Sequence, residues 1–144
     1  MVEPLKVKNL CSRITLHQFG LRATPSRVAI LDIMKSSTHA LSAEEILNKV
    51  NKRIPGVGRA TIYRSITLLE AYDLLKKVHQ EKGCHGYFLS GWKNGHFITC
   101  QKCGVVREIP CGEPNIFFQR VQEKTGFRIL DHLMGLSGLC PQCQ

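Results

Sequence analysis

The spacing of apolar and polar positions predicts helices through most of the first half of the chain. An amphipathic segment runs from Leu5 to Phe19, where Gly20 interrupts the pattern. Thr24 followed by Pro25 is typical of an N-cap and a first helical position, so a second helix is expected to begin there. Its buried side is formed by the apolar residues Val28, Ile30, Leu31, Ile33 and Met34.

Two further helices are predicted from similar signals. Ser42 and Glu45 have the spacing of a capping box, which predicts the start of a third helix that Pro55 ends. A fourth helix is expected over residues 59–72. Its apolar residues fall at i, i+4 and i+7 and make a single stripe of Ile62, Ile66 and Leu69.

After these helices the pattern changes to short β-like runs. Leu74–His79 and Gly86–Ser90 are expected to form a hairpin. Helices followed by such a two-stranded wing define a winged helix-turn-helix, which we assign to residues 1–90. The alternative for this half of the chain is a plain helical bundle with an incidental basic face.

The second half predicts a small mixed unit. A glycine-flanked junction at residues 91–95 is the predicted hinge between two domains. Residues 96–144 predict a β-β-α-β order, with strands at His96–Cys100, Val105–Ile109 and Phe127–Met134. The fold class is therefore α+β, a winged helix followed by a small dimerisation domain. Because such a unit has open sheet edges, we expect a homodimer whose sheet crosses the subunit interface.

Four cysteines of the second half have the spacing of a metal site. Two Cys-x-x-Cys knuckles, Cys100–Cys103 and Cys140–Cys143, each present two thiolates on a tight turn. Together they supply four sulfur ligands and no open position, which is the arrangement of a structural Zn²⁺. The 36 intervening residues mean that the metal ties the start of the domain to its end. Free or disulfide-bonded cysteines are the alternative.

Charge is distributed unevenly between the two halves. The formal net charge is +9, and residues 1–90 carry 14 Lys and Arg against 7 Asp and Glu, whereas residues 91–144 carry 6 against 4. A basic first half predicts a polyanionic partner. Basic and aromatic side chains at the leading end of the fourth helix suit the major groove of double-stranded DNA, and these are Arg59, Tyr63 and Arg64.

The composition argues against a membrane protein. No apolar run approaches the length that spans a bilayer, and the N-terminus lacks the apolar core of a signal peptide, so no membrane partner is expected. Seven cysteines without an export signal indicate reduced thiols used for metal, and we expect a cytoplasmic protein. Cys11 and Cys111 have no partner by spacing and are interpreted as buried or bystander thiols.

Several motifs together resemble the ferric uptake regulator (Fur) family over nearly the whole chain. They are Gly20–Arg27, His39–Ile46, Gly58–Arg64, Cys100-x-x-Cys103-Gly104, Gly126-Phe127, His132 and Cys140-x-x-Cys143. The resemblance implies a dimeric repressor of metal homeostasis genes that binds operator DNA when a sensed metal occupies a site between its domains. It also implies DNA contacts from Arg22, Arg59, Thr61, Tyr63 and Arg64.

The regulatory metal site is where the sequence departs from the family pattern. His79 resembles a ligand position of the zinc uptake (Zur) branch, and Glu108 resembles an acidic ligand found across the family. His96 stands alone where relatives carry a His-rich run. The chain has Phe88 where iron sensors place a glutamate, and Ser90 where zinc sensors place a cysteine. Further candidates are Cys84 and His85 on the hairpin, with His39 and His132 for a secondary site.

We therefore interpret the chain as a metal-dependent repressor with a structural Zn²⁺. Zn²⁺ is the expected sensed ion, because candidates rich in His and Cys suit it better than Fe²⁺. Iron sensing and peroxide sensing are alternatives within the class. A zinc enzyme is not expected, because the four-cysteine site has no open position for water or substrate. A zinc-stabilised protein-interaction module is the alternative from another class, and it leaves the wing and the basic helix face without a role.

Overall fold

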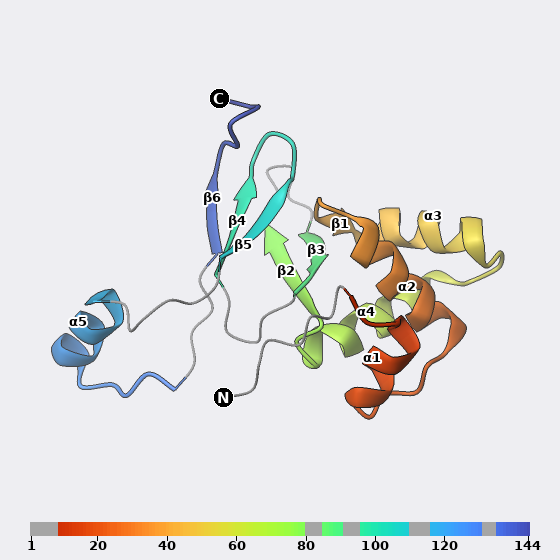
Figure 1. Ribbon diagram of the computed structural model, residues 1–144, viewed down its shortest axis with the longest axis horizontal. Helices are drawn as coiled ribbons and strands as arrows, with labels where there is room; N and C mark the ends of the chain where they lie inside the picture. Colours follow the sequence, from red (N-terminus) through yellow and green to blue (C-terminus); the bar gives the residue numbers. More distant parts are fainter. Residues whose placement is uncertain (1–8, 80–84, 91–95, 110–115, 131–134) are drawn as a thin grey trace.

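The computed structural model describes residues 9–79, 85–90, 96–109, 116–130 and 135–144, and it contains two small sheets with helices grouped around the first (Figure 1). Cys84, Cys111, His132 and the predicted hinge at 91–95 lie outside the described residues. The elements are α1 (Ser12–Gln18), α2 (Pro25–Ser36), β1 (Leu41–Ser42), α3 (Ala43–Arg53), α4 (Arg59–Ala71), β2 (Leu75–His79), β3 (His85–Leu89), β4 (His96–Cys100), β5 (Val106–Ile109), α5 (Ile116–Thr125) and β6 (Gly135–Gly138).

Local sequence signals set the starts of α2 and α3 as predicted. The Thr24 side chain accepts a hydrogen bond from the Arg27 amide at 3.4 Å, and a proline is the first residue of α2. At α3 the capping box is complete, because the Glu45 amide donates to the Ser42 hydroxyl and the Ser42 amide donates to the Glu45 carboxylate. Each cap satisfies an amide that has no partner within its helix.

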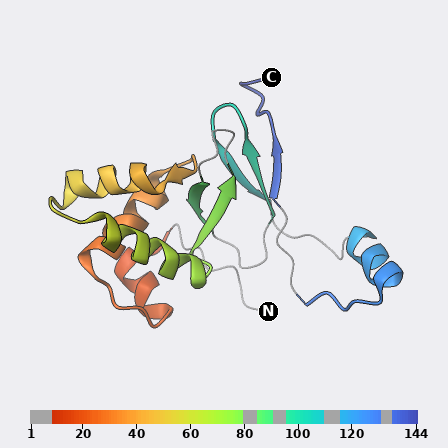
Figure 2. The same cartoon turned by 180° about the vertical axis from the view of Figure 1, so that it is seen from behind.

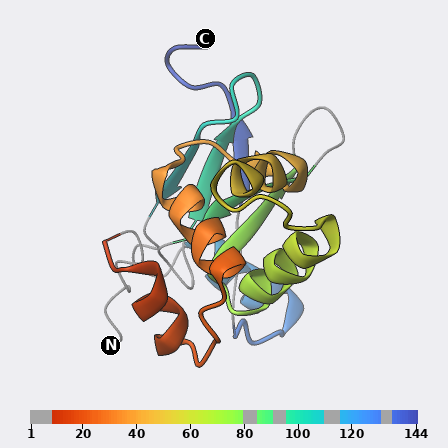
Figure 3. The same ribbon diagram turned by 90° about the vertical axis from the view of Figure 1, so that its right-hand side faces the viewer.

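One apolar core joins these helices to the first sheet. Its buried members come from all four helices and from all three strands of the first sheet, and they include Leu16, Ile30, Leu41, Ile46, Ile62, Leu69, Leu75 and Leu89. Figure 3 shows the helices gathered over the strands, with α3 above α2 and α4 beside it. The first sheet has the order β1-β3-β2 and is antiparallel. This part of the chain is a winged helix, as the sequence predicts.

The second sheet has the order β5-β4-β6 and mixes strand directions. β4 pairs antiparallel with β5 and parallel with β6. The prediction of a third strand at Phe127–Met134 is wrong for the described residues 127–130, which are irregular. The strand forms instead at Gly135–Gly138. A Cβ atom at Gly135 would lie 2.6 Å from the Phe97 ring, so glycine is what lets β6 pair at this point.

α5 has no buried residue. Figures 1 and 2 show it to one side of both sheets, and its Phe118 ring stacks on His96 of β4 with ring centroids 6.4 Å apart. The β-β-α-β order of the second half is thus confirmed.

Among the described residues, no helix combines the length and apolar character needed to cross a bilayer.

Candidate metal centre and nucleic-acid interface

The second sheet brings the two cysteine knuckles together. Cys100 ends β4 opposite Gly138 of β6, so the turns that follow these two strands lie side by side. In each turn an amide closes the knuckle: Gly104 donates to the Cys100 carbonyl at 2.9 Å, and Cys143 donates to the Cys140 carbonyl at 2.8 Å. The parallel pairing of β4 with β6 is therefore the reason that cysteines 40 positions apart meet.

The four thiols have the geometry of a tetrahedral metal site. Their sulfur atoms all lie within 4.8 Å of one another. The Cys103 and Cys140 sulfurs are 3.7 Å apart. Four sulfurs about 2.3 Å from one tetrahedral Zn²⁺ would be separated by about 3.8 Å, so the residues fit a closed zinc site.

Electrostatics within the quartet also favour a cation. The backbone N–H of Cys103, and then that of Cys140, lower the pKa of the Cys100 thiol to about 6. The side chain of Cys140, together with burial and the other thiols, raises the pKa of Cys143 to about 12. The Cys100 thiolate therefore forms readily, and its negative charge opposes the ionisation of a second thiol beside it. A divalent ion removes this repulsion, so its binding releases protons from the remaining thiols.

The basic face of α4 lies away from the core, as predicted. Ile62, Ser65, Ile66 and Leu69 are buried. Arg59 and Arg64 are exposed, Tyr63 is 45% exposed and Thr61 is half-buried. Arg59 donates to the Glu44 carboxylate at 3.1 Å, and both side chains are exposed. Such a pair contributes at most about 1 kcal/mol, so it leaves Arg59 available for a phosphate. Arg22 is also exposed, in the loop before α2.

A second apolar cluster joins the wing to the second sheet. It contains Ala40, Val78 and Phe88 from the first half and Phe97 and Val106 from the second half. The Phe88 and Phe97 rings lie 5.1 Å apart.

Backbone contacts reinforce this junction. The Ala40 amide donates to the Gly104 carbonyl at 3.2 Å, and the Val106 amide donates to the Thr38 carbonyl at 3.1 Å. The Ser90 hydroxyl donates to the Glu108 carboxylate at 3.0 Å. The sequence analysis missed this junction. The signal that could have indicated it is the pair of departures from the family pattern, since Phe88 and Ser90 both lie in it.

Strand register places His96 and Glu108 on opposite faces of the second sheet. Phe97 pairs with Glu108, and His96 pairs with Ile109. Residues directly opposite in an antiparallel pair share a face, and consecutive residues alternate. Glu108 therefore faces the wing together with Phe97, whereas His96 faces the side where Phe118 stacks on it.

His79 lies on a third surface. Val78 and Phe88 face the second sheet, whereas Leu75 and Leu89 face the helical core. By alternation His79 lies on the helix-facing side of the wing, at the exposed end of β2 and opposite His85. The structure thus does not bring His79, His96 and Glu108 together at one point.

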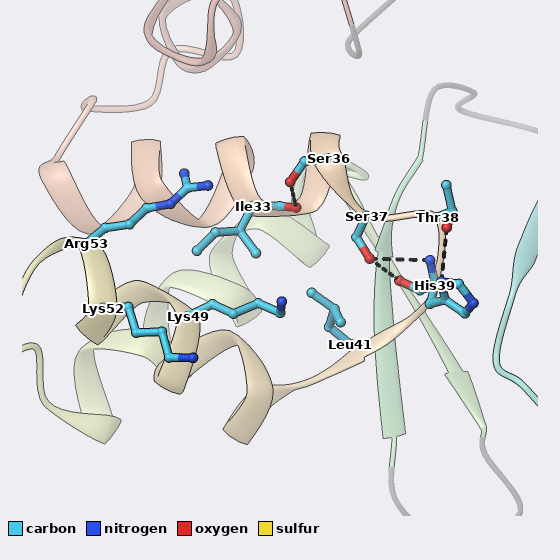
Figure 4. Close-up of a pocket in the computed structure, with 9 residues that line it drawn as sticks. All are labelled: Ile33, Ser36, Ser37, Thr38, His39, Leu41, Lys49, Lys52 and Arg53. Atoms are coloured by element: carbon cyan, nitrogen blue, oxygen red, sulfur yellow. Dashed lines mark hydrogen bonds between the residues drawn. The ribbon is translucent and has the colours of Figure 1, made fainter.

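His39 is exposed in the segment between α2 and β1. It forms a bridge with Val105, and its Nδ1 lies 2.9 Å from the Thr38 hydroxyl. Figure 4 shows it at one end of a cavity of about 370 Å³ between α2 and α3. The cavity also has a basic wall, formed by Lys49, Lys52 and Arg53. These cations complement the partial negative charge at the C-terminal end of α3.

Comparisons with known proteins agree with this geometry. A sequence model of the Ferric uptake regulator family matches residues 18–137. The Ferric uptake regulation protein of Neisseria meningitidis serogroup A is 36% identical over 132 residues, which cover 90% of each chain. The Peroxide-responsive repressor PerR of Staphylococcus aureus is 28% identical over 130 residues, covering 90% of this chain and 87% of that protein.

Solved structures share the fold. The Vibrio cholerae ferric uptake regulator superimposes with a TM-score of 0.62 at 26% identity, over 89% of this chain and 98% of that one. A zinc uptake regulator complexed with zinc and DNA superimposes with a TM-score of 0.72 at 23% identity, over 90% of this chain and 88% of that one.

The winged helix with its basic helix face, the thiol quartet and these relatives define a metal-responsive transcription regulator. The chain belongs to the ferric uptake regulator family. Proteins of this family bind DNA and act as dimers, and they are regulators rather than enzymes.

Proposed function

We propose that the chain is a homodimeric repressor that binds operator DNA of metal homeostasis genes when it carries a sensed metal ion. The observation that carries the proposal is the division of α4 into two faces. Its apolar stripe is buried in the winged-helix core, whereas Arg59, Tyr63 and Arg64 are exposed. A helix held by one face and basic on the other suits insertion into a major groove.

The proposed division of the chain follows from its two units. We propose a DNA-binding domain at 1–90, a hinge at 91–95 and a dimerisation domain at 96–144. The sulfur geometry of the dimerisation domain supports a structural Zn²⁺ at Cys100, Cys103, Cys140 and Cys143. We also propose a cytoplasmic location, because the similar regulators come from bacteria, whose DNA lies in the cytoplasm.

Exposed apolar side chains in the second half support the homodimer. Ile116 is 66% exposed, Phe117 56%, Phe127 76% and Leu130 84%. So large an apolar surface on so small a unit is typical of an interface. Because the family acts as dimers, we propose that a second copy of the chain covers these residues.

Zn²⁺ is the proposed sensed ion. The described regulatory candidates comprise four histidines and one carboxylate, and imidazole-rich sites suit Zn²⁺ better than Fe²⁺. They are His39, His79, His85, His96 and Glu108. Since His96 and Glu108 lie on opposite faces of their sheet, we propose them as ligands at two positions, Glu108 at the junction with the wing and His96 on the α5 side. Fe²⁺ is the second candidate, favoured by the 36% identity to a ferric uptake regulation protein.

DNA binding is tested with one arginine variant and a matched control. Duplexes selected from a random-sequence pool provide the probe, and affinity is measured by fluorescence anisotropy. Arg64→Ala should weaken binding by about 1–3 kcal/mol if the guanidinium reads a base edge. Arg120→Ala removes an arginine that is also exposed, on α5, and should have no effect. Equal affinities for wild type and Arg64→Ala would remove α4 from the DNA surface.

The sensed ion is tested by titration of the same complex. Protein that retains one tightly held zinc per chain is titrated anaerobically with Zn²⁺ and with Fe²⁺, and DNA affinity is followed. Tighter DNA binding at a lower free concentration of Zn²⁺ than of Fe²⁺ supports zinc sensing. Tightening with Fe²⁺ alone supports the second candidate, and no response to either ion contradicts metal dependence.

A further inference from the structure

The cavity between α2 and α3 is lined by three cations that are not part of the basic face of α4. Lys49, Lys52 and Arg53 lie at i, i+3 and i+4 of α3, so they share one face of that helix. Figure 4 shows Lys49 and Arg53 extending from α3 towards Ile33 of α2. No α4 residue is among the described residues that line the cavity, so this basic wall is separate from the surface proposed to bind DNA.

These cations have no acidic partner in the part of the chain that the structure describes. Neither of the ion pairs found there includes them, and no acidic residue is among those that line the cavity. Like charges three or four residues apart on a helix repel one another. The partial negative charge at the end of α3 offsets this repulsion for Lys52 and Arg53, which lie in the last turn, but not for Lys49. A bound anion would offset it for all three.

We propose that the cavity binds a small phosphomonoester, which is a phosphorylated metabolite with an apolar part. Its phosphate group carries a charge of about −1.5 to −2 and three strong acceptor oxygens. The guanidinium of Arg53 can donate two parallel hydrogen bonds to such a group, and the two lysines add point charges. The volume of about 370 Å³ lies within the range of small-molecule sites. Ile33 and Leu41 add apolar surface for the rest of the ligand.

A phosphate of the DNA backbone is the other source of this chemistry. It is a diester with a single charge and two terminal oxygens, so it leaves one of the three cations unmatched. It also carries no apolar group that could contact Ile33 and Leu41. The composition of the cavity therefore favours a free phosphomonoester.

The ligand would also contact the segment that joins the two halves of the chain. Ser37, Thr38 and His39 line one end of the cavity. The Val106 amide donates to the Thr38 carbonyl at 3.1 Å, so this end is bonded to β5 of the second sheet. A ligand that fills the cavity packs against this segment and slows its opening. An effect of this contact on DNA binding rests on the proposed function, whereas the phosphate site does not.

The site is tested without DNA, on full-length protein that keeps its tightly held zinc. Phenyl phosphate is the probe, and isothermal titration calorimetry in phosphate-free buffer measures its affinity. We expect a Kd of about 1 mM or tighter, and binding of the diester dimethyl phosphate that is at least about tenfold weaker. Arg53→Gln and Lys49→Gln should each weaken phenyl phosphate binding by at least about tenfold, because each removes a charge-assisted hydrogen bond. Arg64→Gln on α4 and Lys124→Gln on α5 change exposed cations elsewhere and should leave the Kd unchanged.

The calorimetry can overturn the site or the ligand class. If Arg53→Gln binds phenyl phosphate as wild type does, the cavity is not the site. If Arg64→Gln weakens binding as much as Arg53→Gln, the probe binds at the DNA surface instead. Tighter binding of the dicarboxylate succinate than of phenyl phosphate would overturn the choice of a phosphomonoester.

Duplex binding in the absence of phenyl phosphate separates this proposal from the proposed function. Arg53→Gln should weaken it no more than Lys124→Gln does, and an effect as large as that of Arg64→Ala would show that the cavity cations contact DNA. Phenyl phosphate should slow amide exchange at Val106 in the wild type but not in Arg53→Gln. Binding without slower exchange overturns the contact with the junction alone. The outcome for Arg64→Ala on DNA does not depend on phenyl phosphate binding, so either proposal can fail while the other stands.

Discussion

The two halves of the molecule are stabilised in different ways. In the winged helix, four helices and three strands bury one continuous core, with Leu16, Ile30, Ile62 and Leu69 fully buried. In the described part of the second half, the buried apolar residues are Phe97, Cys100 and Val106, and α5 buries nothing. A unit of that size needs help beyond its own core. The comparison supports the proposal that the first half is stabilised by burial, and the second by a bound metal and a second chain.

The largest expected effect comes from removing one thiol. Cys140→Ser opens the four-sulfur site, and structural zinc supplies on the order of 10 kcal/mol in small zinc peptides. We expect less than one zinc per chain, loss of the dimer in sedimentation, and an intact winged-helix core. Cys11→Ser changes an exposed cysteine outside the quartet and should leave zinc content and dimer unchanged. A zinc-free Cys140→Ser dimer would show that the second half does not depend on metal.

A core substitution should affect the first half alone. Ile62 is fully buried in α4, so Ile62→Ala should lower the free energy of unfolding by about 2–5 kcal/mol. Ile14→Ala changes an isoleucine that is 50% exposed on α1 and should cost far less. Chemical denaturation measures both, with zinc content as the second reading. Zinc loss in Ile62→Ala would mean that the halves unfold together.

The dimer surface can be broken without changing the metal site. Leu130 is 84% exposed, and Leu130→Asp would place a charge in the proposed interface. We expect the dimer to weaken at least about a hundredfold, which corresponds to about 2.7 kcal/mol. Lys124→Asp places the same carboxylate on exposed α5 and is the control. Analytical ultracentrifugation over a dilution series measures both, and an unchanged dimer in Leu130→Asp would exclude this surface.

The smallest expected effect is at the junction between the halves. Phe88→Ala removes the ring that packs 5.1 Å from Phe97. Because the cluster it leaves has only four other described members, the change should cost less than the about 3–5 kcal/mol typical of a phenylalanine in a large core. Amide exchange at Ala40 and Val106, whose N–H groups bridge the halves, should accelerate. Phe88→Leu keeps apolar volume and should accelerate it less. Unchanged exchange in Phe88→Ala would mean that the backbone bonds alone hold the junction.

The same contrast explains which parts of the fold could be predicted from sequence. Caps such as Ser42 with Glu45, and the α4 stripe, are local signals that agree with the core they enter, so those helices were predicted well. β1 was missed because Leu41 and Ser42 form a strand only by pairing with Tyr87 and Gly86.

The third strand of the second half failed for a related reason. Phe127 and Leu130 have the apolar character of a strand, but they are 76% and 84% exposed, and we attribute that character to the proposed dimer interface. The actual strand, Gly135–Gly138, has weak β propensity and depends on the fit of Gly135 to the Phe97 ring. Cysteine spacing did predict the thiol quartet, because it needs no strand assignment. The sequence distances of His96 and Glu108 from the cysteine motif did not reveal that they lie on opposite faces of the sheet, because the strand register sets which face each residue is on.

Amide hydrogen exchange during stepwise zinc chelation tests the central claim most directly. The amides of Cys100, Gln101 and Cys143 donate hydrogen bonds in or beside the metal-bearing turns, whereas those of Leu21, Ile54 and Leu74 donate within the winged helix. We predict that removal of zinc abolishes protection of the first group while the second keeps the protection it has in the zinc-bound protein. Equal loss in both groups, or retention in both, would contradict a molecule whose halves are stabilised in different ways.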